Sequence, residues 1–243
     1  MADDPNIYRN LFLKVLPARD LALLRPSLQF VELKQGDLLG EPGLQVADVL
    51  FVESGMVSLL TTMQDGTAIE IATLGRESVL GVLTSLGDHR GNVRAVVQID
   101  GAGWKIRAAD FRAAVEKSRS LRHLVLLSCE LTIAQMQQTA ACNALHSAER
   151  RLCRWILQVR DRIDRDMIEL TQDFLAQMLA VRRPTVTLIA QSLQNAGLIR
   201  YRRGRITILD PVGLEKLACE CVDEMRTRTR NILSELHQPV RIA

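Results

Sequence analysis

Arginine, threonine and glutamine side chains cluster between residues 182 and 191, and such side chains can read DNA bases. Arginine forms two hydrogen bonds to the edge of a guanine, and threonine offers a hydroxyl or a methyl group. More arginines follow at 202–205, where guanidinium groups can bind phosphates and fix the register on the duplex. The candidate DNA-binding residues are Thr171, Arg182, Arg183, Pro184, Thr185, Thr187, Leu188, Gln191, Arg202, Arg203 and Arg205.

Two short helices and a hairpin are predicted to position these side chains. Thr171 is a good N-cap for the first helix, Pro184 suits the first turn of the second, and Gly197 ends it. Apolar stretches then flank the basic tip at 202–205, so the pattern predicts a winged helix-turn-helix. Its second helix can enter a major groove about 12 Å wide. The alternative is a three-helix protein-interaction module with a solvated basic loop.

The charge distribution agrees with an anionic partner for the second half of the chain. The 243 residues carry a net charge of +3. From His146 onward there are 17 Arg and Lys against 12 Asp and Glu, whereas residues 1–145 hold 14 against 16. Six arginines and no acidic residue lie within 182–205. A locally basic half of this kind favours nucleic acid as the partner.

Other chemistry has weaker support in the sequence. The five cysteines are too few for a disulfide scaffold, and Cys129, Cys142 and Cys153 are interpreted as small buried or seam residues. Cys219 and Cys221 are placed on different faces of a C-terminal helix, so no metal site is predicted. Zincin, Walker and nucleophile-elbow motifs are missing, and Gly101-Ala102-Gly103 is interpreted as a turn between strands. The chain is therefore not expected to be an enzyme.

The first half of the chain is predicted to form short helices followed by an antiparallel sheet. Helical spacing near residues 7–25 is interrupted by Pro17. From Phe30 to about Ile106, apolar stretches alternate with turn signals at intervals of roughly ten residues, which indicates a sandwich or barrel. Turns are expected at 35–37, 41–43, 53–55, 64–66 and 100–101. No apolar run is long enough to span a membrane, and the acidic start lacks a signal-peptide core, so a cytoplasmic protein with no membrane partner is expected.

A long helix is predicted from about Ser120 to Leu145. Apolar or small residues recur along it at alternating steps of three and four, which is a heptad seam. Gln138 within the seam favours a specific helix pairing, so we expect the helix to form a homodimer. The predicted seam comprises Leu124, Leu127, Leu131, Ala134, Gln138, Ala141 and Leu145.

These features together resemble the Crp/Fnr-type transcription regulators over roughly residues 10–215. The stretch 170–187, with Gly197-Leu198-Ile199, resembles the family's helix-turn-helix signature. In the front half, Lys34-Gln35-Gly36-Asp37, Glu41-Pro42-Gly43 and Ser54-Gly55-Met56-Val57 follow the order of the family's cyclic-nucleotide-binding-like β-roll.

The resemblance implies an α+β fold in three parts. These are a β-roll sensor domain (1–118), a dimerisation helix (119–145) and a winged helix-turn-helix DNA-binding domain (146–243). It also implies a homodimer on a pseudo-palindromic site of double-stranded DNA, with activity modulated through the β-roll. RNA polymerase and a small-molecule effector are the further partners that it suggests. A protein-interaction adaptor without DNA binding and a thiol-based redox sensor remain alternatives.

The sequence departs from the family pattern where members that bind cyclic AMP hold the nucleotide. The ribose carboxylate position falls on Val79 or Leu80, which cannot accept a hydrogen bond. The phosphate arginine falls on His89, beside Arg90. The effector is therefore not expected to be cyclic AMP, and no cofactor is assigned. The candidate effector pocket comprises Glu77, Ser78, Val79, Leu80, His89 and Arg90.

Overall fold

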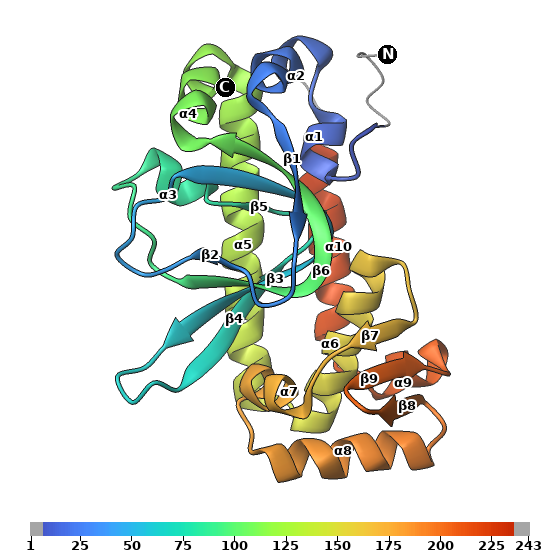
Figure 1. Cartoon of the computed structure of the whole chain (residues 1–243). Coiled ribbons are helices and arrows are strands. Elements are labelled where there is room, and N and C mark those ends of the chain that lie inside the picture. The colour runs from blue at the N-terminus through green and yellow to red at the C-terminus, as the bar shows by residue number, and fades with distance from the viewer. Residues whose placement is uncertain (1–6, 236–243) are drawn as a thin grey trace.

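The computed structural model describes residues 7–235 of the chain (Figure 1). Helices α1 (Leu11–Val15) and α2 (Ala18–Leu24) and the 3-10 turn η2 (Arg25–Ser27) come first. The side chain of Asn10 caps α1 by accepting the N–H groups of Phe12 and Leu13. Pro17 separates the two helices as predicted, and their apolar faces pack against the sheet domain.

Six antiparallel strands form the sheet of the first half. They are β1 (Gln29–Leu33), β2 (Leu38–Gly40), β3 (Asp48–Thr62), β4 (Ala68–Leu74), β5 (Val79–Leu80) and β6 (Arg94–Arg107). The long strands β3 and β6 pair in the middle; β4 and β5 pair with β3, and β1 and β2 pair with β6. This arrangement is the antiparallel β-roll that the resemblance implied.

Two of the predicted turns are wrong, because residues 53–55 and 100–101 lie inside long strands. The register of β3 against β6 shifts between Val52 and Val57, so the segment is a β-bulge that bends both strands. A side chain on Gly101 would come within 2.0 Å of the Ser54 carbonyl oxygen, and Gly55 has φ +80°. Both glycines therefore permit the close approach at the bend, and Gly101-Ala102-Gly103 is not a turn either.

Three helices follow or interrupt the sheet. The short α3 (Val82–Leu86), which the sequence did not predict, lies between β5 and β6. Helix α4 (Ala108–Lys117) leads into α5 (Arg119–Leu145), which runs along the whole sheet domain (Figure 1). The side chain of Ser118 caps α5 by accepting the N–H of Leu121 at 3.0 Å. No helix in the described part of the chain is both long and apolar enough to cross a membrane.

The second half is a helical domain with a small sheet. It contains α6 (Ala148–Ile163), β7 (Met167–Glu169), α7 (Gln172–Leu179), α8 (Arg183–Asn195), β8 (Ile199–Arg202), β9 (Arg205–Ile208), α9 (Pro211–Leu217) and α10 (Cys221–Glu235). The predicted N-cap, first-turn proline and terminal glycine of the helix pair are confirmed, since Thr171 caps α7, Pro184 lies in the first turn of α8 and Gly197 has φ +74°. Strand β7 was not predicted, and it makes the wing a three-stranded sheet.

The core of the second half extends into the β-roll. Trp155 and Ile156 of α6 and Val186 and Leu193 of α8 are buried in it, together with Met56 and Ile99 at the bend of β3 and β6. Helix α10 returns to lie beside α5, where Met225 and Ile232 join the core that α5 shares with α1, α2 and α4 (Figure 1). The two halves are thus packed against each other by apolar contacts at both places.

Candidate nucleic-acid interface

Helix α8 presents its first turns to solvent at one end of the molecule (Figure 1). Its buried side, which includes Val186 and Leu193, packs on the domain core. The opposite side carries the predicted reading residues: Arg182, Arg183, Pro184, Thr185 and Gln191 are exposed, and Thr187 is half-buried. Leu188 is 67% exposed, which is high for an apolar side chain on a folded helix. These side chains lie on the side of α8 that faces away from the core, where a partner can reach them.

The wing is a tight hairpin with arginines at its tip. Arg203 has φ +50° and Gly204 has φ +74°, as in a two-residue turn whose twist matches that of the strands. Arg202 and Arg203 are exposed. Arg205 is also exposed, but its guanidinium lies 3.0 Å from the Glu169 carboxylate of β7. An exposed pair of this kind is weak and can exchange for a phosphate.

The helix pair and the wing share one groove. Its lining residues come from the start of α7, the start of α8 and the turn of the wing, and they are Thr171, Gln172, Arg183, Tyr201, Arg203 and Gly204. Arg183 Nε lies 3.4 Å from Gln172 Oε1, and the Tyr201 hydroxyl donates to the Leu170 carbonyl. The N-termini of two helices and two arginines therefore face one surface, which suits an anion.

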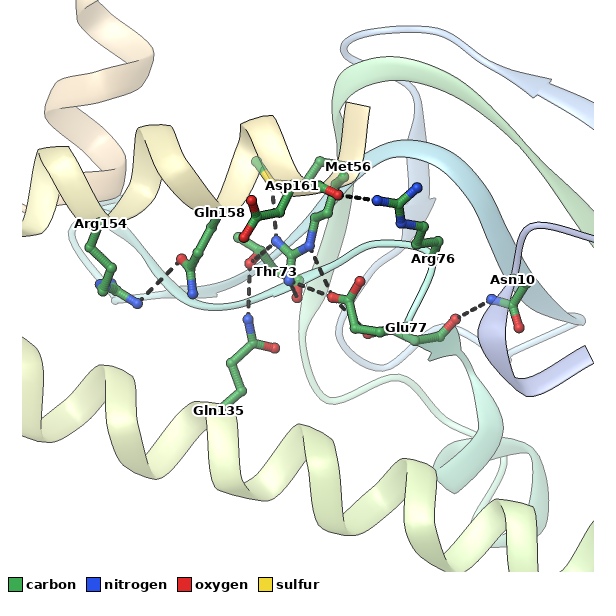
Figure 2. Close-up of polar contacts among 11 residues, drawn as sticks. Asn10, Met56, Thr73, Arg76, Glu77, Gln135, Arg154, Gln158 and Asp161 are labelled. Carbon is green, nitrogen blue, oxygen red and sulfur yellow. Dashed lines mark hydrogen bonds and ion pairs between the residues drawn. The ribbon is translucent and has the colours of Figure 1, made fainter. Parts of the chain in front are cut away.

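A buried ion pair joins this domain to the β-roll. Arg162 of α6 lies with its guanidinium 2.6 Å from the Glu77 carboxylate, and the two side chains are 9% and 13% exposed. Arg162 also donates to the hydroxyl of Thr73, which accepts from Gln135 of α5 as well. Figure 2 shows Thr73 at the centre of this network, between the helices α5 and α6. One residue of β4 thus connects both helices to the sheet.

The predicted effector residues are not brought together. Glu77 is held by Arg162, and Glu77 and Ser78 line a crevice of about 290 Å³ beside α10. Arg90 is exposed and donates to the Gly43 carbonyl, and His89 lies in the same loop; neither residue lines this crevice or the cavity beside Val79. The expectation of one pocket for all six residues is wrong, because the chain turns at Gly81 and carries the 89–90 loop away from Glu77.

Val79 and Leu80 do line a cavity, which lies between the sheet and α5. Its volume is about 160 Å³, and most of its lining is aliphatic. Its polar side chains are those of Thr84, Asn92, Ser128, Cys129 and Thr132, and its lining holds no charged side chain. The lining therefore offers no cationic group to pair with a cyclic phosphate, and the aliphatic side chain of Val79 cannot accept a ribose hydroxyl.

The predicted heptad seam of α5 faces the chain's own core over its first half. Leu124, Leu127 and Leu131 are buried against α4 and α10, and Leu131 is only 4% exposed. Ala134 is buried as well, and Gln138 Nε2 lies 3.0 Å from Cys221 Sγ. Only Ala141 and Leu145 are exposed. These five seam residues are therefore not available to a second chain in this fold, since the chain's own elements, α4, α10 and the α9–α10 link among them, cover them.

A different stripe of α5 is open to solvent. Leu126 and Ile133 are exposed, at 66% and 50%, and Ala140 continues the stripe at the same seven-residue interval. Cys129 and Met136 lie between them and are half-buried. Steps of three and four alternate along this stripe, so it is itself a heptad seam.

A buried carboxyl group lies between the sheet and the DNA-binding half. Burial raises the pKa of Glu70 to about 7, against the opposing effects of Ser58 and of the Arg154 and Arg162 guanidinium groups. Ser58 Oγ lies 2.6 Å from Glu70 Oε2 and 2.8 Å from Gln98 Oε1. A serine has one proton to donate. If Ser58 donates to Gln98, a protonated Glu70 donates to Ser58 and every group is satisfied.

Sequence reasoning missed Arg162, Thr73 and Glu70 as residues that connect the two halves. Arg162 lies on the predicted helix α6 beside other arginines, and nothing in its neighbours along the chain distinguishes it from the half-buried Arg160. Its partner Glu77 lies 85 residues away. A single sequence offers no signal for such a contact.

Comparison with known proteins agrees with the two-part fold. Residues 30–118 match the family model of the cyclic nucleotide-binding domain, and residues 150–217 match that of the Crp-like helix-turn-helix domain. The global nitrogen regulator of Synechococcus elongatus is 24% identical over 208 residues, which cover 82% of this chain and 93% of that protein.

Solved structures show the same architecture. A transcriptional regulator of the crp/fnr family from Eubacterium rectale superposes with a TM-score of 0.66 at 19% identity, covering 83% of this chain and 94% of that one. FixK2 from Bradyrhizobium japonicum superposes with a TM-score of 0.68 at 14% identity, and the match covers 79% of this chain and 98% of FixK2. At these identities the likeness concerns the fold.

Proposed function

The chain is a Crp/Fnr-type transcriptional regulator and not an enzyme, and from this premise we propose that it binds a two-fold symmetric DNA site as a homodimer. Regulators of this family bind DNA through the helix-turn-helix and are typically dimers. In this chain, α8 would enter the major groove and the wing would lie along the flanking phosphates.

The observation that carries this proposal is the shared groove of α7, α8 and the wing. Arg183 and Arg203 border it, and Arg182, Thr185 and Gln191 stand exposed beside it. Arg182, Arg183 and Gln191 can each donate to a base edge, while Arg203 and Arg202 are placed on the side where a backbone would pass. A protein-interaction module would not need this alignment of donors with two helix N-termini.

A binding selection with randomised duplex DNA tests the proposal. The expected result is an inverted repeat whose half-sites are one helical turn apart, about 10–10.5 base pairs. The mass of the complex should correspond to two chains per duplex. The affinity for DNA should fall steeply as the salt concentration rises. The slope of log affinity against log salt concentration should be proportional to the number of phosphates that the protein contacts. Binding without sequence preference, or none at all, would favour the adaptor alternative.

For the dimer, we assign the second copy of the chain to the exposed stripe of α5. Leu126, Cys129, Ile133, Met136 and Ala140 present an apolar seam on the longest helix. Such a seam is stabilised when it packs against its own copy in a parallel coiled coil. Contact with RNA polymerase is carried over from the family alone.

For the effector, the cavity beside Val79 favours a small, mostly apolar molecule over a cyclic nucleotide. Ser128 and Thr132 line it from α5, so an occupant would touch the helix proposed to form the dimer. A ligand that favours one of two arrangements of that helix would shift the balance between them. Calorimetry with cyclic AMP should show no binding. A micromolar dissociation constant that persists in Arg90→Ala would show that the cavity has been misjudged.

A further inference from the structure

Four side chains with ligating atoms meet where α5 ends. Cys142 and His146 come from the last turn of α5 and its C-cap, and Cys219 and Cys221 come from the link between α9 and α10. One atom of each lies within 4.8 Å of the others. Cys142 Sγ is 3.5 Å from Cys219 Sγ, and Cys221 Sγ is 3.5 Å from His146 Nδ1. The three cysteines are buried and His146 is half-buried.

We propose that these four residues bind one Zn²⁺ ion through three thiolate sulfurs and His146 Nδ1. In a tetrahedral site, Zn–S bonds of about 2.3 Å and a Zn–N bond of about 2.0–2.1 Å place two sulfurs about 3.8 Å apart and a sulfur about 3.5 Å from the nitrogen. The two separations in the structure are close to these values. Three sulfurs and one imidazole are a donor set that suits Zn²⁺ and not Mg²⁺ or Ca²⁺.

The surrounding residues hold the ligands as in a metal site. His146 Nε2 lies 3.1 Å from Glu220 Oε1, so Nε2–H can donate a hydrogen bond to the carboxylate. The lone pair of Nδ1 is then available to the ion. Gln138 Nε2 lies 3.0 Å from Cys221 Sγ and can donate to a thiolate there. Each contact fixes the orientation of one ligand, which is the role of the outer shell around a bound metal.

The charges near the cluster favour a bound thiolate set. When Zn²⁺ binds, the three thiols release their protons to solvent, and the complex with a neutral imidazole has a net charge of −1. Arg151 and Arg154 on α6 are both buried, at 8% and 7% exposure, and both lie near enough to Cys142 and Cys219 to interact with their charges. Their guanidinium groups would offset the charge of the complex inside the fold.

A Cys142–Cys219 disulfide is the competing use of these residues. It would join only two of the four side chains and give no role to the Nδ1 of His146, to Cys221 or to the Gln138 contact. One ion explains all four ligands and both outer contacts together. It would also fasten the end of α5, where the chain turns into α6, to the link that precedes α10. The site does not depend on the proposed DNA contacts.

The sequence reading placed Cys219 and Cys221 on one helix and therefore on different faces. In the structure, α10 begins at Cys221 and Cys219 lies in the preceding turn, so both sulfurs reach the same place. Cys142 and His146 are four residues apart at the end of a helix, which puts them on one face. The pairs are joined only by the packing of α10 against α5 and α6.

Metal analysis of the full-length chain, prepared without a histidine tag and without oxygen, tests the proposal. We expect about one Zn²⁺ per chain. After its removal, Co²⁺ should give the visible bands of a tetrahedral site and a near-ultraviolet thiolate charge-transfer band. Cys219→Ser and Cys221→Ser should lose the metal, whereas Cys129→Ser and Cys153→Ala, which change the two cysteines outside the cluster, should retain it.

The outer contacts give a graded test. Gln138→Ala and Glu220→Gln should bind Zn²⁺ about 10-fold to 100-fold more weakly than the parent, with an unchanged circular dichroism spectrum. Three results would overturn the proposal. They are a reduced parent protein without zinc or cobalt bands, full zinc binding in the Cys219→Ser/Cys221→Ser double variant, and a Cys142–Cys219 disulfide in protein prepared without oxygen. The parent cobalt spectrum is decisive even if a variant fails to fold.

Discussion

The guanidinium of Arg162 on α6 donates two hydrogen bonds to Glu77 Oε1 in the β-roll, at 2.6 and 2.9 Å. Because both side chains are almost enclosed, this pair is a fixed connection between the DNA-binding half and the sensor half. It places α6, and with it α7 and α8, relative to the sheet. A change that breaks the pair should therefore alter both stability and the arrangement of the two halves.

Breaking this pair should be costly because it leaves a buried charge without its partner. We expect Glu77→Gln to lower the free energy of unfolding by about 3–5 kcal/mol, measured by urea denaturation. The neighbouring Arg76→Gln is the matched control, since Arg76 pairs with the more exposed Asp164. It should cost about 0–1 kcal/mol. If both variants lost the same free energy of unfolding, the role given to the buried pair would be contradicted.

Arg183 and Arg203 should have separate effects on DNA binding. Arg183→Ala should reduce the binding free energy by about 1–3 kcal/mol at the one base pair that Arg183 contacts, and the base preference at that position should weaken. Arg203→Ala should weaken binding to all DNA sequences alike. It should also reduce by about one the slope of log affinity against log salt concentration. Selections with each variant at two salt concentrations measure both effects. If Arg183→Ala keeps the parent preference while Arg203→Ala changes it, the assigned roles are reversed.

The half-site should depend on Pro184 and Leu188 as well. Pro184 has no polar side-chain atom, and the exposed Leu188 can touch only an apolar group such as a thymine methyl. Leu188→Ala should therefore reduce the preference for one thymine by a small factor and leave the salt slope unchanged. The same selection measures it. A changed salt slope would indicate that Leu188 acts through the docking of α8 and not through a base.

Two neighbouring residues of α5 should separate dimerisation from folding. Ile133→Glu puts a charge into the exposed seam and should give a monomer by light scattering, with the helical content retained. Leu131→Ala empties a buried site and should lower stability by about 2–5 kcal/mol while the mass stays that of the dimer. An unchanged mass for Ile133→Glu would place the dimer interface elsewhere.

Stability should depend on the pH through Glu70. Its pKa is raised to about 7 in the folded chain by burial, whereas an unfolded glutamate has a pKa of about 4.3. The folded state thus binds more protons between these values, so this group's contribution to stability is complete below pH 4.3 and falls as the pH rises to 7. Glu70→Gln, whose amide can donate to Ser58, should remove that decline and stabilise the chain at pH 8 by at most about 4 kcal/mol.

Urea midpoints measured from pH 4.5 to pH 8 test this expectation. The parent should lose stability relative to Glu70→Gln as the pH increases, and the two curves should converge at the acidic end. Parallel curves would mean that Glu70 is ionised throughout, with Ser58 donating to it and not to Gln98.

The sequence by itself determined the features that depend on near neighbours. Thr171, Pro184 and Gly197 act within one turn of the helices that they begin or end, so their effect is visible in the residue order. The helix pair, the basic wing tip and the long α5 follow from the same local spacing. The order of motifs in the front half was enough to indicate the β-roll.

Only the tertiary structure decided which faces meet. Moving a seam by two positions, from Leu131 to Ile133, rotates it by about 200° around a helix of 3.6 residues per turn. Both stripes of α5 have heptad spacing, and the one that contains Leu131 is buried because α10 packs against it. The contacts of Arg162 with Glu77 and of Cys142 with Cys219 span 85 and 77 residues. Such contacts form because the two halves fold onto each other, and no local spacing encodes them.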